Sequence, residues 1–144
     1  MAPAKGPFRI LVIEDNSTDV GLIKEALSGS AVEHEMMVLE DGRRALEHLK
    51  QLGDQKPDLI ILDLNMPKHD GLEVLIQYRM NVALFAVPII VLTSSDAPSD
   101  KLRAKMIGVS AFIRKPLKLE DFISLGEQFK AILETPYIYT GPTV

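Results

Sequence analysis

Five residues in this sequence together provide the chemical groups needed to bind and transfer a phosphoryl group. They are three carboxylates, a hydroxyl and an ammonium: Glu14, Asp15, Asp63, Thr93 and Lys115. If the three carboxylates are packed together, at least one pKa should rise unless a cation intervenes. A partly hydrated carboxylate site suits Mg²⁺, which prefers oxygen ligands and retains several waters. Phosphoryl transfer asks a protein mainly for positioning and charge neutralisation, which a metal, an ammonium and a hydroxyl can supply.

Asp63 is the residue best placed to act as nucleophile and to become an aspartyl phosphate. It follows the apolar run 59–62, and the turn signals Met66-Pro67 and Asp70-Gly71 come soon after it. An apolar run of this kind is typical of a strand that is covered on both faces. Asp63 is therefore expected at the carboxyl edge of a parallel sheet, where open α/β folds bind their ligands.

The sequence predicts that strands and helices alternate along the chain. Apolar runs indicate strands at 8–13, 35–39, 59–62, 87–92 and 110–114. Capping residues and apolar spacing indicate helices that begin near residues 17, 42, 71, 98 and 119 and end near 28, 53, 82, 107 and 133. Short connections between these elements imply right-handed crossovers and an α/β fold with a doubly wound, five-stranded parallel sheet. The carboxyl ends of all strands would then share one rim, where the five residues should converge.

Length and composition limit what kind of protein this is. The 144 residues, of which 47% are hydrophobic and 25% charged, fit one globular domain. There is no cysteine, so disulfides and thiol chemistry are excluded. A net charge of −4 disfavours direct nucleic-acid binding, and no apolar stretch is long enough for a membrane span. We expect a cytoplasmic protein.

The predicted domain occupies residues 8–133 and has a segment on either side. Residues 1–7 are rich in proline and glycine and are expected to form a flexible leader. Residues 134–144 contain Tyr137, Ile138 and Tyr139 among prolines and a glycine, which excludes a further helix. This tail is either a frayed terminus or an apolar strap that contacts a partner or a second subunit.

Each chemical residue also has an ordinary structural interpretation. Asp63 alone could be a turn former, and Thr93 could be a β-branched residue at a strand end. Lys115 could form a surface ion pair of little energetic value. Phe112 could be plain core. The joint occurrence of five such residues at the ends of consistent strands favours the functional interpretation.

The sequence resembles the receiver domain of two-component response regulators from about Phe8 to Leu133. The resemblance is carried by five motifs: Ile13-Glu14-Asp15-Asn16, Asp41-Gly42 with Ala45-Leu46, Pro57 to Gly71 around Asp63, Val87 to Ser94, and Phe112-Ile113-Arg114-Lys115-Pro116. It implies a (βα)5 flavodoxin-like receiver fold. The tail, the stretch Asp63 to Pro67 and the lack of an attached output domain also resemble the single-domain regulators that are paired with bacterial phytochrome kinases.

This resemblance implies a phosphorylation site with a metal. Asp63 would take a phosphoryl group from a histidine of a sensor kinase. Asp15 and Asp63 would ligate Mg²⁺, and Asn65 would contribute its backbone carbonyl. Glu14 stands where family members often carry a second aspartate, and it would act directly or through water. The protein would catalyse its own phosphorylation and slow dephosphorylation but serve chiefly as a signalling switch.

The resemblance also implies a switch linked to that site. Lys115 would pair with the phosphoryl oxygens, and the Thr93 hydroxyl would swing toward them. Phe112 would change rotamer as the linked aromatic residue. The Lys115–Pro116 peptide bond would be cis. Asn65 and Ser95 match positions that tune hydrolysis of the aspartyl phosphate.

Phosphorylation would then shift the preference of one face for its partners. This face comprises the fourth helix, the fifth strand and the fifth helix. Its charges of both signs could pair across a two-fold axis in a homodimer: Lys101, Arg103, Lys105, Arg114, Glu120 and Asp121. Because no output segment follows Leu133 in this sequence, we expect the signal to be a protein contact.

Three other functions compete with this hypothesis. A flavin-binding protein of the same fold needs a phosphate-binding loop after the first strand, where this chain has Glu14-Asp15. A phosphatase with an aspartate nucleophile uses a second acid two residues later, where this chain has Asn65. The strongest rival is a binding module that keeps the receiver shape without accepting phosphate. A base-labile mass gain on incubation with Mg²⁺ and a small phosphodonor would separate the phosphate-accepting receiver from this binding module.

Overall fold

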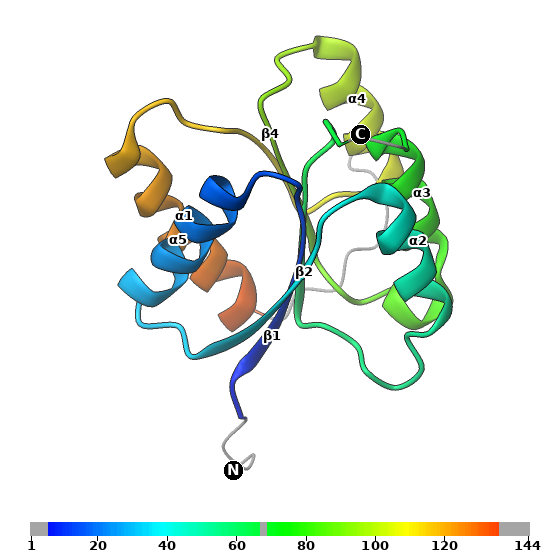
Figure 1. Ribbon diagram of the computed structural model, residues 1–144, viewed down its shortest axis with the longest axis horizontal. Helices are drawn as coiled ribbons and strands as arrows, with labels where there is room; N and C mark the ends of the chain where they lie inside the picture. The colour runs from blue at the N-terminus through cyan, green and yellow to red at the C-terminus, as the bar shows by residue number, and fades with distance from the viewer. Residues whose placement is uncertain (1–5, 67–68, 136–144) are drawn as a thin grey trace.

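The fold is a five-stranded parallel sheet with helices on both faces (Figure 1). The computed structural model describes residues 6–66 and 69–135, so most of the leader and most of the tail lie outside the described residues. The strands are β1 (Phe8–Ile13), β2 (His34–Leu39), β3 (Leu59–Leu62), β4 (Ile89–Thr93) and β5 (Ala111–Arg114). Their order is β2-β1-β3-β4-β5, and every neighbouring pair is parallel. The predicted fold class is confirmed.

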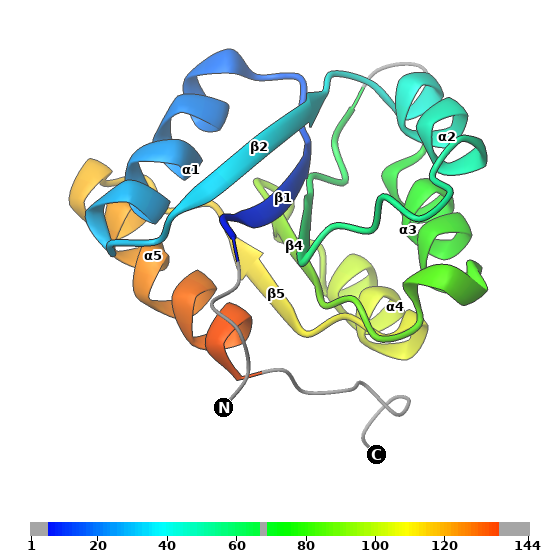
Figure 2. The ribbon, with the colours of Figure 1, turned by 90° about the horizontal axis from the view of Figure 1, so that it is seen from below.

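Helices cover the sheet in two groups. The helices are α1 (Ser17–Gly29), α2 (Gly42–Lys50), α3 (Gly71–Met80), α4 (Pro98–Ile107) and α5 (Leu119–Glu134). Figures 1 and 2 show α1 and α5 on one face and α2, α3 and α4 on the other. A glycine at 126 permits the close packing of α1 and α5, because a Cβ there would collide with the carbonyl of Ala26.

Two apolar cores result, one on each face of the sheet. Side chains of β3 alternate between them: Ile60 and Leu62 face α2, α3 and α4, whereas Leu59 and Ile61 face α1 and α5. All residues of β3 and β4 are buried, as the continuous apolar runs predicted. These two central strands therefore give a rigid base to whatever follows their carboxyl ends.

Side-chain caps fix where three of the helices begin, close to the ends of the strands. The carboxamide oxygen of Asn16 accepts from the backbone N–H of Asp19 at 3.0 Å and caps α1. Asp41 caps α2 by accepting from the N–H of Arg44 at 2.8 Å, and Asp70 caps α3 in the same way. Such caps stabilise a helix start by about 1 kcal/mol each. They also hold the loops of the rim in place.

The observed boundaries depart from the predicted ones in a few places. α3 ends at Met80 rather than near residue 82, because Asn81 is extended and caps a short 3₁₀ helix, η1 (Val82–Leu84). β4 begins at Ile89 rather than at residue 87, and the preceding Pro88 has no N–H to donate to a strand neighbour. α2 ends at Lys50, ahead of the predicted Gly53. Within the described part of the chain, no helix has the length and apolar character that crossing a membrane requires.

Candidate functional site

The five chemical residues come together at the carboxyl ends of the strands, as expected. Glu14 and Asp15 directly follow β1, and Asp63 directly follows β3. Thr93 is the last residue of β4, and Lys115 is the first residue after β5. One carboxylate oxygen from each of the three acids lies within 4.8 Å of the others. Residues that are remote along the chain thus form one acidic cluster with an ammonium beside it.

Lys115 places its ammonium among three carboxylates. Its Nζ lies 2.6 Å from Oε1 of Glu14, 2.7 Å from Oδ2 of Asp19 and 3.0 Å from Oδ2 of Asp63. An ammonium has three N–H donors, so each carboxylate can accept one of them. Only 13% of the Lys115 side chain is exposed, which excludes the interpretation as a loose surface ion pair.

The backbone of Lys115 is held by pairing with β4, and the Lys115–Pro116 peptide bond is trans. The N–H of Lys115 donates to the carbonyl of Thr93 at 2.8 Å and so continues the pairing of β5 with β4 by one residue. The residues that the structure describes contain no cis peptide bond, so the prediction of a cis Lys115–Pro116 bond is wrong here. Trans is the favoured form of an X–Pro bond by about 0.5–1 kcal/mol.

The two oxygens of Asp63 have different partners. Oδ1 accepts from the backbone N–H of Asn65 at 3.0 Å, which fixes the carboxylate against its own loop. Oδ2 faces Lys115. The backbone N–H of Asp63 donates to the carbonyl of Ile13 at 3.0 Å and continues the pairing of β3 with β1. Although only 3% of Asp63 is exposed, it lines an open cavity and so meets solvent from one side.

Glu14 is the most deeply buried of the three acids, with 2% of its surface exposed. The pKa of its carboxyl is raised to about 8, chiefly by burial and also by the nearby Asp63, while Lys115 acts in the opposite direction. Burial alone would lower the pKa of the Lys115 ammonium, but its hydrogen bonds to Asp19 and Glu14 and the charge of Asp63 raise it overall. The expected rise in a carboxyl pKa is therefore found at Glu14, with burial rather than repulsion as its main cause.

The predicted switch residues occupy different surroundings. Thr93 is fully buried, and its hydroxyl accepts from the backbone N–H of Ser95 at 3.3 Å. Phe112 is partly buried and packs against the core that faces α3 and α4. Its ring is therefore neither free in solvent nor locked in the centre of the core. The roles assigned to these two residues stay predictions.

Sequence reasoning did not identify two residues of this site. Asp19, in the first turn of α1, contacts Lys115, and Ser94 accepts a hydrogen bond at 3.1 Å from the side-chain amide of Asn65. An acid in the first turn of a helix is usually explained by its interaction with the helix dipole. Asp19 therefore gave no separate reason to be assigned to the site. The available signal was its place one turn after the acidic pair, on a helix that starts at the rim.

The chemistry of the acidic cluster fits a hard divalent cation. Glu14, Asp15 and Asp63 offer carboxylate oxygens at mutual distances that one ion could bridge. They adjoin an open cavity of about 630 Å³ whose lining is mostly polar: Asp15, Asn16, Ser17, Thr18, Asp19, Asp63, Asn65, Ser94 and Lys115. Oxygen ligands that leave room for water are what Mg²⁺ and similar ions require. These residues can therefore hold a divalent metal.

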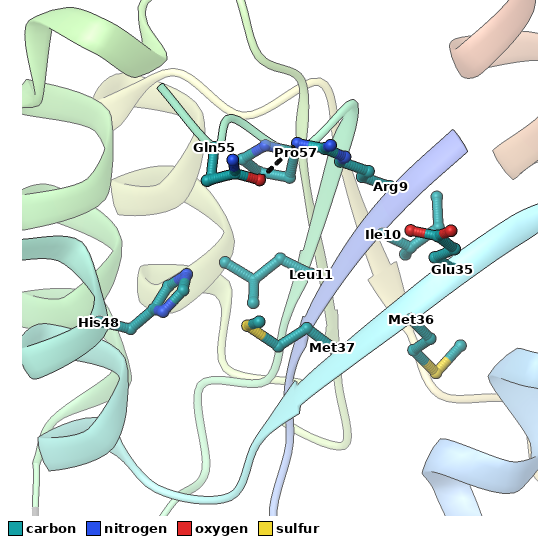
Figure 3. A pocket seen from close by; sticks show the side chains of 9 residues that line it. All are labelled: Arg9, Ile10, Leu11, Glu35, Met36, Met37, His48, Gln55 and Pro57. Atoms are coloured by element: carbon teal, nitrogen blue, oxygen red, sulfur yellow. Dashed lines mark hydrogen bonds between the residues drawn. The ribbon is translucent and has the colours of Figure 1, made fainter. Parts of the chain in front are cut away.

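A second cavity lies near the amino ends of β1 and β2 and has a different character (Figure 3). Its volume is about 260 Å³, and its lining is Arg9, Ile10, Leu11, Glu35, Met36, Met37, His48, Gln55 and Pro57. Figure 3 shows Leu11, Met37 and His48 on the side of the strands that faces α2. The Arg9 guanidinium donates to the side-chain oxygen of Gln55 at 2.8 Å. This lining has a single carboxylate, so it lacks the grouping of acids that defines the rim site.

Comparison with known proteins identifies the family. A family model described as the response regulator receiver domain matches residues 10–125. Response regulator Rcp1 of a Synechocystis strain is 36% identical over 134 residues, which cover 90% of this chain and 91% of Rcp1.

Solved structures agree with this match. A crystal structure of the phosphorylated cyanobacterial phytochrome response regulator RcpA has a TM-score of 0.83 at 31% identity, covering 94% of this chain and 100% of that one. The Mn²⁺-bound form of Rcp1 has a TM-score of 0.81 at 35% identity, covering 92% and 99%. The protein is therefore a member of the response regulator receiver family, whose domains work with cognate histidine kinases in two-component systems.

Proposed function

We propose that Asp63 accepts a phosphoryl group from a histidine of a sensor kinase, with Mg²⁺ bound by Glu14, Asp15 and Asp63, and that the product changes a protein-binding face. The observation that carries this proposal is the position of the Asp63 carboxylate. One of its oxygens is fixed by Asn65, and the other lies beside Lys115 at the edge of an open polar cavity. Such an arrangement presents a nucleophile together with a fixed positive charge.

The transfer step needs no proton from the protein. A carboxylate oxygen of Asp63 forms a bond to phosphorus while the bond between phosphorus and the imidazole nitrogen of the phosphohistidine breaks. The electron pair of the broken bond stays on that nitrogen, and a proton on the other ring nitrogen of the phosphohistidine makes the leaving group a neutral imidazole. Lys115 can donate to an oxygen of the transferred group, and a bound Mg²⁺ supplies positive charge that offsets the charge of that group. We propose the backbone carbonyl of Asn65 as a further metal ligand.

The covalent phosphate should persist long enough to act as a signal. The residue two positions after Asp63 is Asn65, whose amide cannot act as a general acid or base. Hydrolysis by the protein itself is therefore slow. The Thr93 hydroxyl would leave the N–H of Ser95 and donate to the phosphoryl group, and this would move the loop that follows β4. Phe112 would respond to that movement, and the population of partner-binding conformations would shift.

The proposal is tested by incubating the protein with acetyl phosphate and MgCl₂ and measuring its intact mass. We expect a base-labile gain of one phosphoryl group, which Asp63→Asn lacks and which excess EDTA prevents. Asp58→Asn is the matched control, because Asp58 lies before the amino end of β3 and should leave the gain unchanged. If the unmodified protein gains no mass under these conditions, the rival function as a phosphate-independent binding module is favoured.

We further propose that the kinase is a phytochrome. This rests on the similarity to RcpA, which is a cyanobacterial phytochrome response regulator. An autophosphorylated phytochrome kinase used as donor in the same assay should transfer its label to Asp63 faster than a histidine kinase of another sensory class.

The proposed homodimer uses the face formed by α4, β5 and α5, with the tail as a strap. The charged residues predicted for this face are all exposed, and Leu102 and Met106 of α4 are exposed beside them. Most of the tail lies outside the described residues. Sedimentation velocity with and without beryllofluoride, a phosphoryl mimic, tests this proposal: an association that strengthens with the mimic supports it, and a monomer under both conditions contradicts it.

A further inference from the structure

Asp19 is a third carboxylate on the Lys115 ammonium, and the proposed function assigns it no role. Its Oδ2 lies 2.7 Å from Nζ, closer than the 3.0 Å that separates Nζ from Asp63. Its position is well defined, because its backbone N–H donates to the capping oxygen of Asn16. Asp19 also lines the open cavity beside Asp63. It is not one of the three acids of the metal cluster.

Asp19 and Glu14 hold the ammonium from sides that differ in exposure. The Glu14 side chain is 3% exposed and contacts Nζ from the buried side of the rim. The Asp19 side chain is 19% exposed and contacts Nζ from the side of the open cavity. Without Asp19, the remaining attractions on Lys115 would come from Glu14 and Asp63, which are both almost fully buried. The ammonium would then be free to withdraw from the mouth of the cavity.

We propose that Asp19 is a positioning residue that keeps the Lys115 ammonium on the open side of Asp63, where the oxygens of an incoming phosphoryl group arrive. This inference rests on the proposed function of Asp63. Asp19 also adds a negative charge at the mouth of the cavity, which repels an anionic phosphodonor. It therefore raises the maximal rate of phosphorylation at a cost in affinity for the donor.

Two substitutions separate these effects. Asp19→Ala removes both the acceptor oxygen and the charge, so the maximal rate should fall about tenfold, since a charge-assisted hydrogen bond that orients a reacting group is lost. The donor concentration at half-maximal rate should also fall, by about twofold, because one repulsive charge is gone. Asp19→Asn keeps an acceptor oxygen without the charge. It should retain most of the maximal rate and show the same fall in half-saturation.

The experiment measures the initial rate of phosphorylation against acetyl phosphate concentration in MgCl₂, at constant ionic strength. Glu25→Ala is the matched control, because Glu25 is an exposed acid on the same helix, six residues further from its start. A second measurement uses no phosphodonor: the ¹⁵Nζ signal of the Lys115 ammonium is recorded by NMR in the free protein. It should be sharp in the unmodified protein and in Glu25→Ala, and broadened by proton exchange in Asp19→Ala.

The outcomes distinguish failure of the positioning role of Asp19 from failure of the proposed phosphorylation of Asp63, on which that role rests. Opposite effects on the maximal rate and the donor affinity in Asp19→Ala, with the rate largely kept in Asp19→Asn, support the positioning role. Kinetic constants equal to those of Glu25→Ala, or a loss of active protein with unchanged constants for the folded fraction, overturn it. If the unmodified protein takes up no phosphoryl group, the proposed function of Asp63 fails, and with it the positioning role. The NMR signal would then report only whether Asp19 restrains Lys115.

Discussion

Two of the cavities in the described part of this protein lie toward opposite ends of the strands, and they differ in the chemistry that their linings allow. At the carboxyl end, buried acids and an ammonium surround an open polar cavity. Toward the amino end, the cavity beside β2 is lined by Leu11, Met37 and other mostly apolar groups, and its polar pair Arg9–Gln55 is exposed. Both cavities are built on the same sheet, so the strands themselves do not explain the difference.

The difference follows from the direction of the chain. In a parallel α/β fold every helix begins near the carboxyl end of a strand, so free N–H groups and capping side chains gather at that rim. Here Asn16, Asp41 and Asp70 cap helices that start there. The rim can therefore hold polar and charged groups that the rest of the core cannot. At the amino end of the strands, by contrast, side chains such as Leu11 pack into the apolar core.

The largest expected effects come from substituting one buried residue at each end of the strands, and they differ in whether stability or phosphorylation is lost. Leu11→Ala removes a side chain that is 2% exposed and borders the amino-end cavity, so the free energy of unfolding should fall by about 3 kcal/mol. Asp63→Asn should abolish phosphorylation but lower this free energy by less than about 1 kcal/mol, because it also removes one of several clustered like charges. Urea denaturation and the phosphorylation assay measure the two quantities.

A matched variant in the same cavity sharpens this prediction. Met37 is 50% exposed, so Met37→Ala should cost less than about 1 kcal/mol of stability. The folded fraction of Leu11→Ala should be phosphorylated at the rate of the unmodified protein. If Leu11→Ala instead slows phosphorylation of the folded protein more than tenfold, the two ends are coupled and the comparison fails.

The sequence predicted the sheet well because its central strands are unambiguous. β3 and β4 are continuous apolar runs, which only a strand covered on both faces explains at this length. Helix starts were equally clear at Asn16, Asp41 and Asp70, where a capping residue precedes apolar spacing. Once the strands are known to be parallel, the convergence of the acids and Lys115 follows from topology alone.

The sequence could not predict features that depend on side-chain reach. The contact between Asp19 and Lys115 joins the first turn of α1, which follows β1, to the loop after β5, and β3 and β4 lie between these two strands. The peptide bond before Pro116 was assigned from resemblance, and the described chain has it trans. The main cause of the raised Glu14 pKa, burial, required knowing how deeply its carboxyl lies.

A smaller effect tests the electrostatics that set the rim apart. Glu14 is buried, and its pKa is raised to about 8 in the folded protein from 4.5. Between these values the folded state retains a proton that the unfolded state has lost, so this group makes stability fall as pH rises. Glu14→Gln cannot lose a proton. In metal-free buffer its free energy of unfolding should therefore rise relative to the unmodified protein from about pH 5 to pH 8, by on the order of 2 kcal/mol.

Urea denaturation at several pH values in the presence of EDTA measures this difference, and Glu35→Gln at the amino-end cavity is the matched control. Glu35 is exposed, so its substitution should change the free energy of unfolding by less than about 0.5 kcal/mol. The sign of the Glu14→Gln difference decides between two forces that act on one carboxyl. If the ion pair with Lys115 outweighed burial, the pKa of Glu14 would lie below its ordinary value. The unmodified protein would then gain stability relative to the variant as pH rises through the acid range, and the difference would have the opposite sign.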